Sequence, residues 1–354
     1  MSVQVKRIMK RMFMWAGLAF FALAAVMLYW QLSKFSLSDI WASLSNIPMH
    51  NLVLACVATF GSYIALSCYD YLALRYVGRM VSWWRWLLAG MVGFAVSNNA
   101  GHAMISGGSI RYRLYTRWRI KASEIVKMIT FSGFTYLMGC VSTVTVSYFL
   151  VPKDAFGGDV IAGYGIDLLM LFCAGFLLLY FGAAFFYRKT IKIKGLRFKV
   201  PTPGTALRQS LIGMTDSVFA GLALYALLSS FVEIPFITFI GIFVMAQVVG
   251  VFSPVPGGIG VFETIFMLAM SNFGNPSAIF AALIAYRIIY FLIPLVGIGG
   301  MFVLYEHNLR QRVKGWVSEA KARAARVSTR IHNVHIPRPH LPTFKRRGVR
   351  RGRK

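Results

Sequence analysis

Charged residues are scarce in this sequence, and acidic residues especially so. Only 14% of its 354 residues are charged, with 11 acids compared with 38 lysines and arginines. A soluble domain carries roughly 25% charged residues, so this composition excludes an ordinary soluble globular protein. The chain is instead 57% hydrophobic. We therefore predict an all-α polytopic membrane protein, for which the bilayer is the main solvent.

Cysteine is also scarce. The four cysteines, at positions 56, 68, 140 and 173, lie singly within apolar segments, without CxxC spacing or neighbouring histidines. This pattern indicates neither a metal site nor a disulfide framework. The nucleotide-binding pattern GxxxxGK[ST] does not occur either. We expect no cofactor, and any transport by this protein would have to be downhill or coupled to an ion.

The positive charge lies between the apolar runs and at the two ends of the chain. Residues 1–12 are basic, residues 188–208 form a basic linker, and residues 306–354 form a basic tail that we expect to be partly disordered. Basic segments of membrane proteins stay in the cytoplasm. We therefore predict a multi-pass protein of the bacterial inner (cytoplasmic) membrane, with both termini in the cytoplasm.

The same rule explains the net charge of +27 without a nucleic acid, which we do not expect as a partner. Anionic phospholipid is the predicted partner, because basic residues near an anionic leaflet are attracted to its headgroups. Whether the chain forms a homodimer is left open by the sequence.

The apolar runs predict about six transmembrane helices. The run at residues 13–30 is long for the core of a signal peptide, so we predict that it remains as the first helix. The other crossings are expected between residues 50 and 75 and at residues 124–151, 166–187, 210–231 and 278–305. Residues 36–48 have their apolar side chains on one helical face and predict a short helix at the membrane surface.

Two further apolar segments cannot cross the membrane under the same rule. Residues 86–108 have basic residues on both sides, and residues 236–272 lie between two crossings that already return the chain to the cytoplasm. Each is predicted to enter and leave on the same side as a re-entrant hairpin, so that residues 13–187 and 209–305 form an inverted repeat. Two ordinary short helices, or one tilted span, are the alternatives for the first segment.

The centres of these two segments are polar and rich in glycine, as a turn inside the membrane requires. The residues that we expect at the turns are Asn98, Asn99, Gly101, His102, Gly107 and Gly108 in the first segment and Pro256, Gly257, Gly258 and Gly260 in the second. His102 has no other typical metal-binding residue near it in the sequence, so no metal site is predicted there.

A few charged residues lie within or next to apolar runs, namely Asp70, Arg111, Arg113, Asp216, Glu263 and Arg287. A charge in the bilayer centre costs roughly 2.5 to 3.5 kcal/mol on insertion scales, so each one needs a partner or a function. One interpretation is a set of purely structural ion pairs. The other is a polar cavity in which the arginines bind a lipid phosphate, while the acids hold the guanidinium groups or bind a cationic headgroup.

Four motifs, in this order and spacing, resemble a known family. They are YDYLAL around Asp70, ISGGSIRYRLY at residues 105–115, PVPGGIGVFE at residues 254–263 and YRIIYFLIPL at residues 286–295. Together they resemble the N-terminal flippase unit of the lysylphosphatidylglycerol synthase/flippase family (multiple peptide resistance factor) and the related YbhN-type membrane proteins. The resemblance implies that the protein moves a phospholipid, with or without an aminoacyl group, between leaflets.

The resemblance also implies that Asp70 and Arg111 lie in the lipid pathway, with Arg113 as the second candidate for the arginine. Bifunctional members of the family carry a soluble aminoacyl-transferase domain after this unit, whereas this chain continues into its basic tail. We therefore expect a transporter and not an enzyme. Two alternatives stay open: a membrane enzyme that acts on phospholipid headgroups with Asp70 or His102 as the base, and a non-catalytic subunit that partners a separate lysylphosphatidylglycerol synthase.

Overall fold

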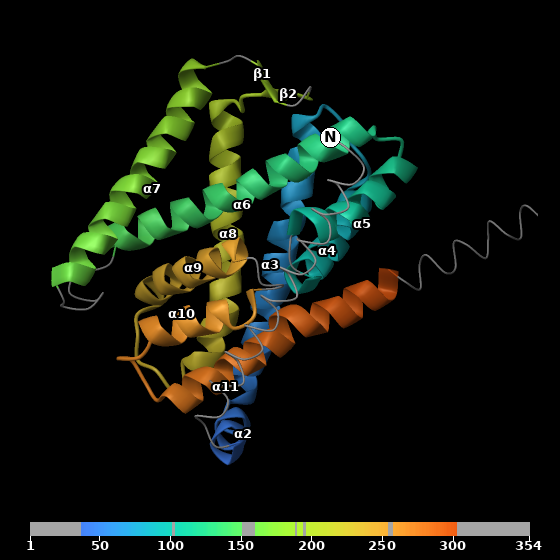
Figure 1. The fold of residues 1–354 in the computed structure, drawn as a ribbon. Helices are drawn as coiled ribbons and strands as arrows, with labels where there is room; N and C mark the ends of the chain where they lie inside the picture. The colour runs from blue at the N-terminus through green and yellow to red at the C-terminus, as the bar shows by residue number, and fades with distance from the viewer. Residues whose placement is uncertain are drawn as a thin grey trace, which may run out of the picture. The chain divides into compact units, whose positions relative to one another are not determined.

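The computed structural model describes residues 37–100, 103–150, 160–187, 190–193, 196–253 and 258–302, and these form a mostly helical fold (Figure 1). The first part of the chain contains α2 (Leu37–Ser45), α3 (Met49–Tyr76), α4 (Trp83–Ala100), α5 (Ala103–Arg117), α6 (Ala122–Leu150) and α7 (Val160–Phe186). After the strands β1 (Thr190–Ile193) and β2 (Leu196–Lys199) follow α8 (Pro203–Leu228), α9 (Phe236–Phe252), α10 (Val261–Ala269), α11 (Pro276–Tyr286) and the π-helical segment η3 (Arg287–Leu292).

Five helices of the described part are long and apolar enough to cross a membrane. They span Met49–Tyr76, Ala122–Leu150, Asp167–Phe186, Pro203–Leu228 and Pro276–Phe302, and each overlaps a run that the sequence predicts as a crossing. The sixth predicted run, at residues 13–30, lies outside the described residues, as do the N-terminal residues 1–12 and the tail from residue 306. All the candidate membrane spans in the described part of the chain are therefore α-helical, as the sequence predicts.

Two pairs of shorter helices overlap the segments predicted to be re-entrant, although α5 continues past the predicted end of the first segment at residue 108. In the first pair α4 packs against α5, and in the second α9 packs against α10. Helix α10 has 9 residues, which is about 14 Å of helix compared with a hydrocarbon thickness of about 30 Å. Helix α10 is thus too short to cross. That the two pairs enter from opposite sides of the membrane stays a prediction.

The turn before α10 depends on glycine. Gly258 and Gly260 have positive φ angles of 62° and 83°, which residues with a side chain rarely adopt. A Cβ on Gly258 would also lie 2.8 Å from the Gly250 carbonyl oxygen of α9. In the first segment, Asn98 and Asn99 lie in the last turn of α4 and Gly107 and Gly108 lie within α5, so these four residues are helical and not at the turn itself. Gly101 and His102 of the first segment and Pro256 and Gly257 of the second lie outside the described residues.

Small residues bring the long helices close together. Helix α3 packs along α8, and α6 crosses α8 (Figure 1). Where α6 crosses α8, a Cβ added to Gly139 of α6 or to Gly213 of α8 would lie 2.4 Å from the backbone of the other helix. Next to it, Gln209 of α8 donates a hydrogen bond of 2.8 Å to Thr135 of α6. Such close contacts of small and polar residues are typical of helix packing in membranes.

The predicted linker at residues 188–208 contains regular structure. Its strands pair antiparallel, with Thr190 opposite Lys199, and α8 begins within it at Pro203. Three of the four residues in TIKI are β-branched, which favours a strand over a helix. The Tyr76 hydroxyl at the end of α3 donates to the Lys199 carbonyl at 2.7 Å, which joins this hairpin to the helical part.

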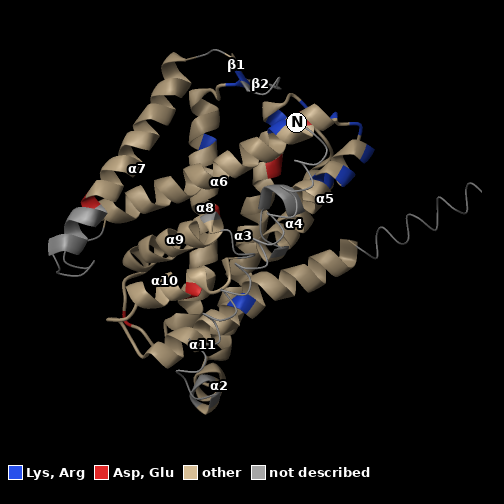
Figure 2. Ribbon diagram, in the orientation of Figure 1, with Lys and Arg blue, Asp and Glu red and all other residues tan. Residues whose placement is uncertain are grey.

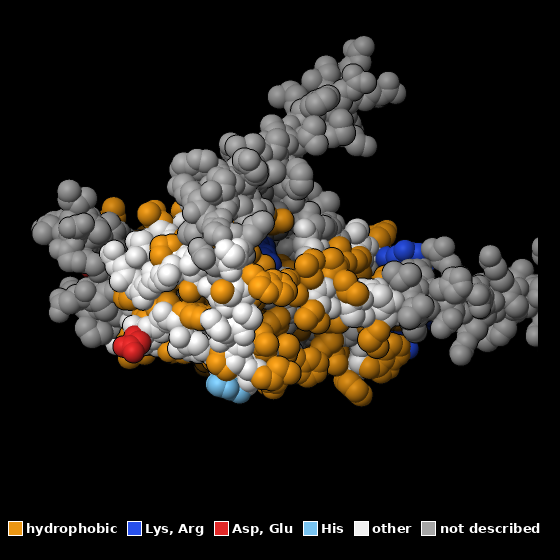
Figure 3. All heavy atoms as spheres, turned by 90° about the horizontal axis from the view of Figure 1, so that it is seen from below, with side chains coloured by type: hydrophobic (Ala, Val, Ile, Leu, Met, Phe, Trp, Pro, Cys, Tyr) orange, Lys and Arg blue, Asp and Glu red, His pale blue; other side chains and the backbone are white. Residues whose placement is uncertain are grey.

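Charge is distributed unevenly over the described fold. Figure 2 shows lysines and arginines gathered toward the end where β1, β2 and the C-terminal part of α5 lie. The opposite end, seen from below in Figure 3, presents mainly hydrophobic and uncharged side chains. Large apolar side chains are also exposed along α7, where Leu178 and Leu179 are 75% and 76% exposed. This surface suits a lipid environment.

Candidate functional site

Asp70 and Arg111, predicted from the sequence, form a buried ion pair between α3 and α5. The Arg111 Nε donates to both carboxylate oxygens of Asp70, at 2.9 and 3.1 Å. Tyr115, one helical turn further along α5, donates its hydroxyl to the same carboxylate at 2.9 Å. The two charged side chains are only 4% and 1% exposed, so each compensates the charge of the other in a dry interior.

The Arg111 guanidinium lies next to Gly93 and Gly107, where the absence of side chains leaves room for it. Its Cζ lies 4.2 Å from the centre of the Phe94 ring, and a Cβ on Gly93 would approach Cζ to 3.0 Å. A Cβ on Gly107 would lie 3.2 Å from Nη1. The Nη2 atom is buried and has no hydrogen-bond partner among the described residues. The two N–H groups of this nitrogen therefore have no acceptor within the described part of the chain.

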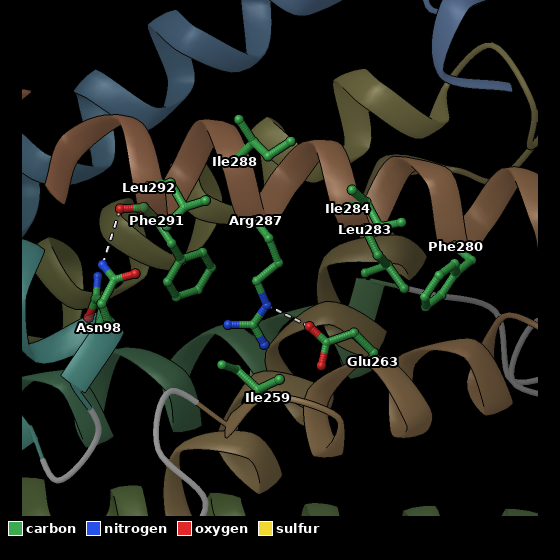
Figure 4. Close-up of a pocket in the computed structure, with 11 residues that line it drawn as sticks. Asn98, Ile259, Glu263, Phe280, Leu283, Ile284, Arg287, Ile288, Phe291 and Leu292 are labelled. Atoms are coloured by element: carbon green, nitrogen blue, oxygen red, sulfur yellow. Dashed lines mark hydrogen bonds and ion pairs between the residues drawn. The ribbon is translucent and has the colours of Figure 1, made fainter. Parts of the chain in front are cut away.

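Glu263 and Arg287 form a second ion pair, between α10 and η3. Arg287 Nε donates to Glu263 Oε1 at 2.5 Å, and the Gly260 backbone N–H donates to Oε2 at 2.7 Å. Glu263 therefore caps its own helix and holds the arginine at the same time. Figure 4 shows the Arg287 side chain extending from its helix between Glu263 and Phe291, whose ring centre lies 4.5 Å from Cζ.

This second pair faces a groove of about 320 Å³. Asn98 and Asn99 of α4 line one part of it, Ile259 and Glu263 line another, and the remaining wall consists of apolar side chains of α11 and η3 (Figure 4). Asn99 Nδ2 donates to the Phe291 carbonyl at 3.1 Å. The groove therefore joins the first short-helix pair to the second, and it combines one ion pair with a long apolar wall.

The π-helical segment η3 was not foreseen from the sequence. Its six residues begin with Arg287, and two side chains from the first half of the chain bond to its backbone. Tyr63 of α3 donates to the Tyr290 carbonyl at 3.2 Å, and Asn99 donates to that of Phe291. Short π-helical turns are frequent at functional sites. The run AYRIIYFLIP carries no sequence signal that separates a π turn from an α-helix.

Asp216 on α8 has a different environment. Ser62 donates to one of its carboxylate oxygens at 2.6 Å and Tyr69 to the other at 2.9 Å. The sequence predicted that the three acids hold the arginines or bind a cationic headgroup. Asp216 holds no arginine among the described residues, since it forms no ion pair there. The reason is geometric, since Asp216 faces the hydroxyl-bearing side of α3 and not α5 or α10.

The other predicted residues occupy less central places. The Arg113 side chain is exposed, so it does not join Arg111 at Asp70. Gly108 lies in α5, where a Cβ would meet Ile129 at 3.2 Å. Sequence reasoning assigned no role to Ser62, Tyr69, Tyr115 and Tyr290. The three tyrosines lie within the quoted motifs, but the motifs alone do not show which acid each hydroxyl contacts, and Ser62 is only a polar residue within an apolar run. Among the described residues, no group of three or more His, Cys, Asp or Glu side chains could hold a metal ion.

Comparison with known families decides the assignment. The family model described as the lysylphosphatidylglycerol synthase TM region matches residues 14–298, which include both ion pairs and the groove. The chain belongs to this family. The family resemblance that the four motifs predict is thereby confirmed, and the protein is a multi-pass membrane protein.

Three relatives illustrate the range of the lysylphosphatidylglycerol synthase TM family. An uncharacterized protein of Synechocystis sp. is 31% identical over 306 residues, which cover 84% of this chain and 94% of that protein. The inner membrane protein YbhN of Escherichia coli is 28% identical over 301 residues, covering 82% and 90%. The phosphatidylglycerol lysyltransferase of Staphylococcus xylosus is 24% identical over 292 residues, covering 79% of this chain but only 32% of the lysyltransferase.

Proposed function

We propose that this protein moves a phospholipid between the two leaflets of the bacterial inner membrane, as a flippase or scramblase without enzymatic activity. The observation that carries the proposal is the groove, in which an arginine held by a glutamate faces an apolar wall at the junction of the two short-helix pairs. A phospholipid has the matching chemistry, with an anionic phosphate next to acyl chains.

The phosphate binds to Arg287 in this proposal. A guanidinium group binds phosphate through two parallel hydrogen bonds, and the Arg287 side chain is 19% exposed, whereas that of Glu263 is 5% exposed. When the phosphate displaces Glu263 from Arg287, the glutamate keeps its bond from the Gly260 N–H. The acid is therefore not left without a partner while the lipid is bound, which lowers the cost of the exchange.

The family suggests the class of lipid and the membrane. One relative is a phosphatidylglycerol lysyltransferase, so we propose phosphatidylglycerol, free or aminoacylated, as the lipid. Another relative is an inner membrane protein, and we propose the same membrane for this chain, with both termini in the cytoplasm. Dimerisation and association with a separate synthase remain alternatives within this proposal.

The repeated order of helices along the chain supports alternating access to the groove. In the first half, the pair α4–α5 follows α3 and precedes α6 in the sequence, and in the second half the pair α9–α10 follows α8 and precedes α11. We propose that both pairs are re-entrant and belong to an inverted repeat, since such repeats place a polar site near the midplane of transporters. Arg111 and Asp70 would then form the matching polar site of the first half.

The proposal is tested by the movement of labelled phosphatidylglycerol in proteoliposomes. Wild-type protein should move the lipid faster than protein-free liposomes. Arg287→Gln should slow the movement about ten- to a hundredfold, because it removes a charged hydrogen-bond donor from the headgroup site. Arg208→Gln removes an exposed arginine of α8 and should leave the rate unchanged. Equal rates for wild type and protein-free liposomes would refute the proposed function.

A further inference from the structure

Asp216 is a buried acid for which the lipid groove gives no role. It is only 3% exposed, and the hydroxyl groups of Ser62 and Tyr69 contact its two oxygens at 2.6 and 2.9 Å. The titratable groups that face it from the packed helices are Tyr63 and Tyr69 of α3, Tyr136 and Cys140 of α6, Tyr286 of α11 and Tyr290 of η3. None of these side chains is a cation.

This environment differs from that of Asp70. Asp70 is equally buried but lies against the Arg111 guanidinium, which stabilises its negative charge. An ionised carboxylate that is buried without a positive partner is strongly disfavoured, and such a group takes up a proton instead. Since Asp216 forms no ion pair with any described residue, its interior position favours the neutral acid.

The hydroxyl partners of Asp216 can accommodate both of its forms. A hydroxyl group donates one hydrogen bond and accepts others, and its hydrogen rotates to suit. When Asp216 is ionised, Ser62 donates to it and accepts from Tyr290, whose hydroxyl lies 2.8 Å from the Ser62 Oγ. When Asp216 carries a proton, it donates to Ser62, and Ser62 donates to Tyr290. The same positions of the heavy atoms fit both states.

The hydroxyl chain ends on the segment that carries the lipid-facing arginine. Tyr290 belongs to η3, which begins with Arg287. Tyr63 also donates to the Tyr290 carbonyl at 3.2 Å, so α3 contacts this π-helical turn at two atoms of one residue. The Ser62–Tyr290 hydrogen bond therefore links Asp216 to the turn that carries Arg287.

We propose that Asp216 is a proton-binding site, and that its protonation and deprotonation are coupled through Ser62 and Tyr290 to lipid movement in the groove. The proton comes from water on one side of the membrane, binds a carboxylate oxygen of Asp216 and is released to water on the other side. No covalent bond other than this O–H bond forms or breaks. The coupling rests on the proposed function, whereas the proton site itself does not.

Infrared spectroscopy of the full-length protein in lipid nanodiscs tests the proton site without any transport. At neutral pH, wild type should show a protonated-carboxyl C=O band that shifts in heavy water, and Asp216→Asn should lose this band. Asp70→Asn should retain it, because Asp70 is paired with a cation. Ser62→Ala keeps the acid but removes one of its hydrogen bonds, so the band should shift in position. A band that is unchanged in Asp216→Asn and in Ser62→Ala would overturn the proposal.

A transport assay tests the coupling. In proteoliposomes with a pH gradient, a protonophore should slow phosphatidylglycerol movement by wild type but leave the rate of Asp216→Asn unchanged. If the wild-type rate did not depend on the pH gradient, or depended on a sodium gradient instead, the proposed coupling to protons would be overturned. If wild type moves no lipid at all, the proposed function fails, while the infrared band still decides whether Asp216 carries a proton.

Discussion

At the scale of single residues, the two buried aspartates show how partners decide the role of an acid. Asp70 and Asp216 are the same residue type at similar burial, 1% and 3% exposed, on two helices that pack along each other. One has a cation and a tyrosine as partners, and the other has a serine and a tyrosine. Only the first contributes to charge compensation, so the same substitution should have different effects at the two sites.

Asp70→Asn should therefore destabilise the protein much more than Asp216→Asn. The first change leaves Arg111 as an unpaired buried cation, which costs about 3–5 kcal/mol when one partner of a buried pair is removed. The second exchanges a carboxyl group for an amide that keeps hydrogen bonds to hydroxyls, with an expected cost of about 1 kcal/mol. Thermal unfolding of the two variants in detergent measures the difference. Equal losses would mean that the Asp70–Arg111 pair does not stabilise the fold.

At the scale of helices, glycine sets the spacing of α6 and α8. Gly139 and Gly213 meet at their crossing, and neither has space for a methyl group. Gly133 lies on the same helix α6, but a Cβ there would meet nothing within 4 Å. The two glycines of α6 thus differ in packing and not in local helix structure.

Gly139→Ala should lower the melting temperature, because it pushes the backbones of α6 and α8 apart. Gly133→Ala is the matched control and should be neutral or stabilising by up to about 1 kcal/mol, since alanine favours the helix over glycine. Melting curves of the purified variants test this pair. A similar destabilisation by both substitutions would contradict the close crossing.

The orientation of the short-helix pairs is testable at the same scale. If the repeat is inverted, the segment that links α5 to α6 faces the cytoplasm and the segment that links α10 to α11 faces the other side. Cysteines introduced for the exposed residues Lys121 and Ser271, in a chain without its native cysteines, should then react with a membrane-impermeant reagent from opposite sides. If both cysteines reacted from the same side of the membrane, the predicted inverted repeat would be wrong.

The sequence predicts the long helices well, and the contacts between them poorly, for physical reasons. A bilayer of fixed thickness demands about 20 apolar residues per crossing, so a run such as Ala122–Leu150 is recognisable from its own residues. The pairing of Arg111 with Asp70 depends on how α5 packs against α3, which no local pattern encodes. The hydroxyl partners of Asp216 and the π-helical turn at Arg287 depend on packing in the same way.

At the scale of the whole molecule, the described helices place residues from both halves around one groove. Asn98 and Asn99 reach it from the first half, and Glu263 and Arg287 from the second. Neither half could form this site alone, because Asn99 donates a hydrogen bond to the backbone of η3 in the other half. The membership of the chain in the lysylphosphatidylglycerol synthase TM family covers both halves, so the groove lies within the shared part.

The central claim is that the two halves share one binding site for a phospholipid headgroup, and photo-crosslinking tests it most directly. Phosphatidylglycerol with a photoreactive headgroup is incorporated with the protein, and the modified peptides are identified by mass spectrometry. We predict crosslinks to α4 near Asn98 and to η3 near Arg287, both reduced in Arg287→Gln and unchanged in Arg208→Gln. Crosslinks confined to the exposed helix α7, or unaffected by Arg287→Gln, would contradict the account.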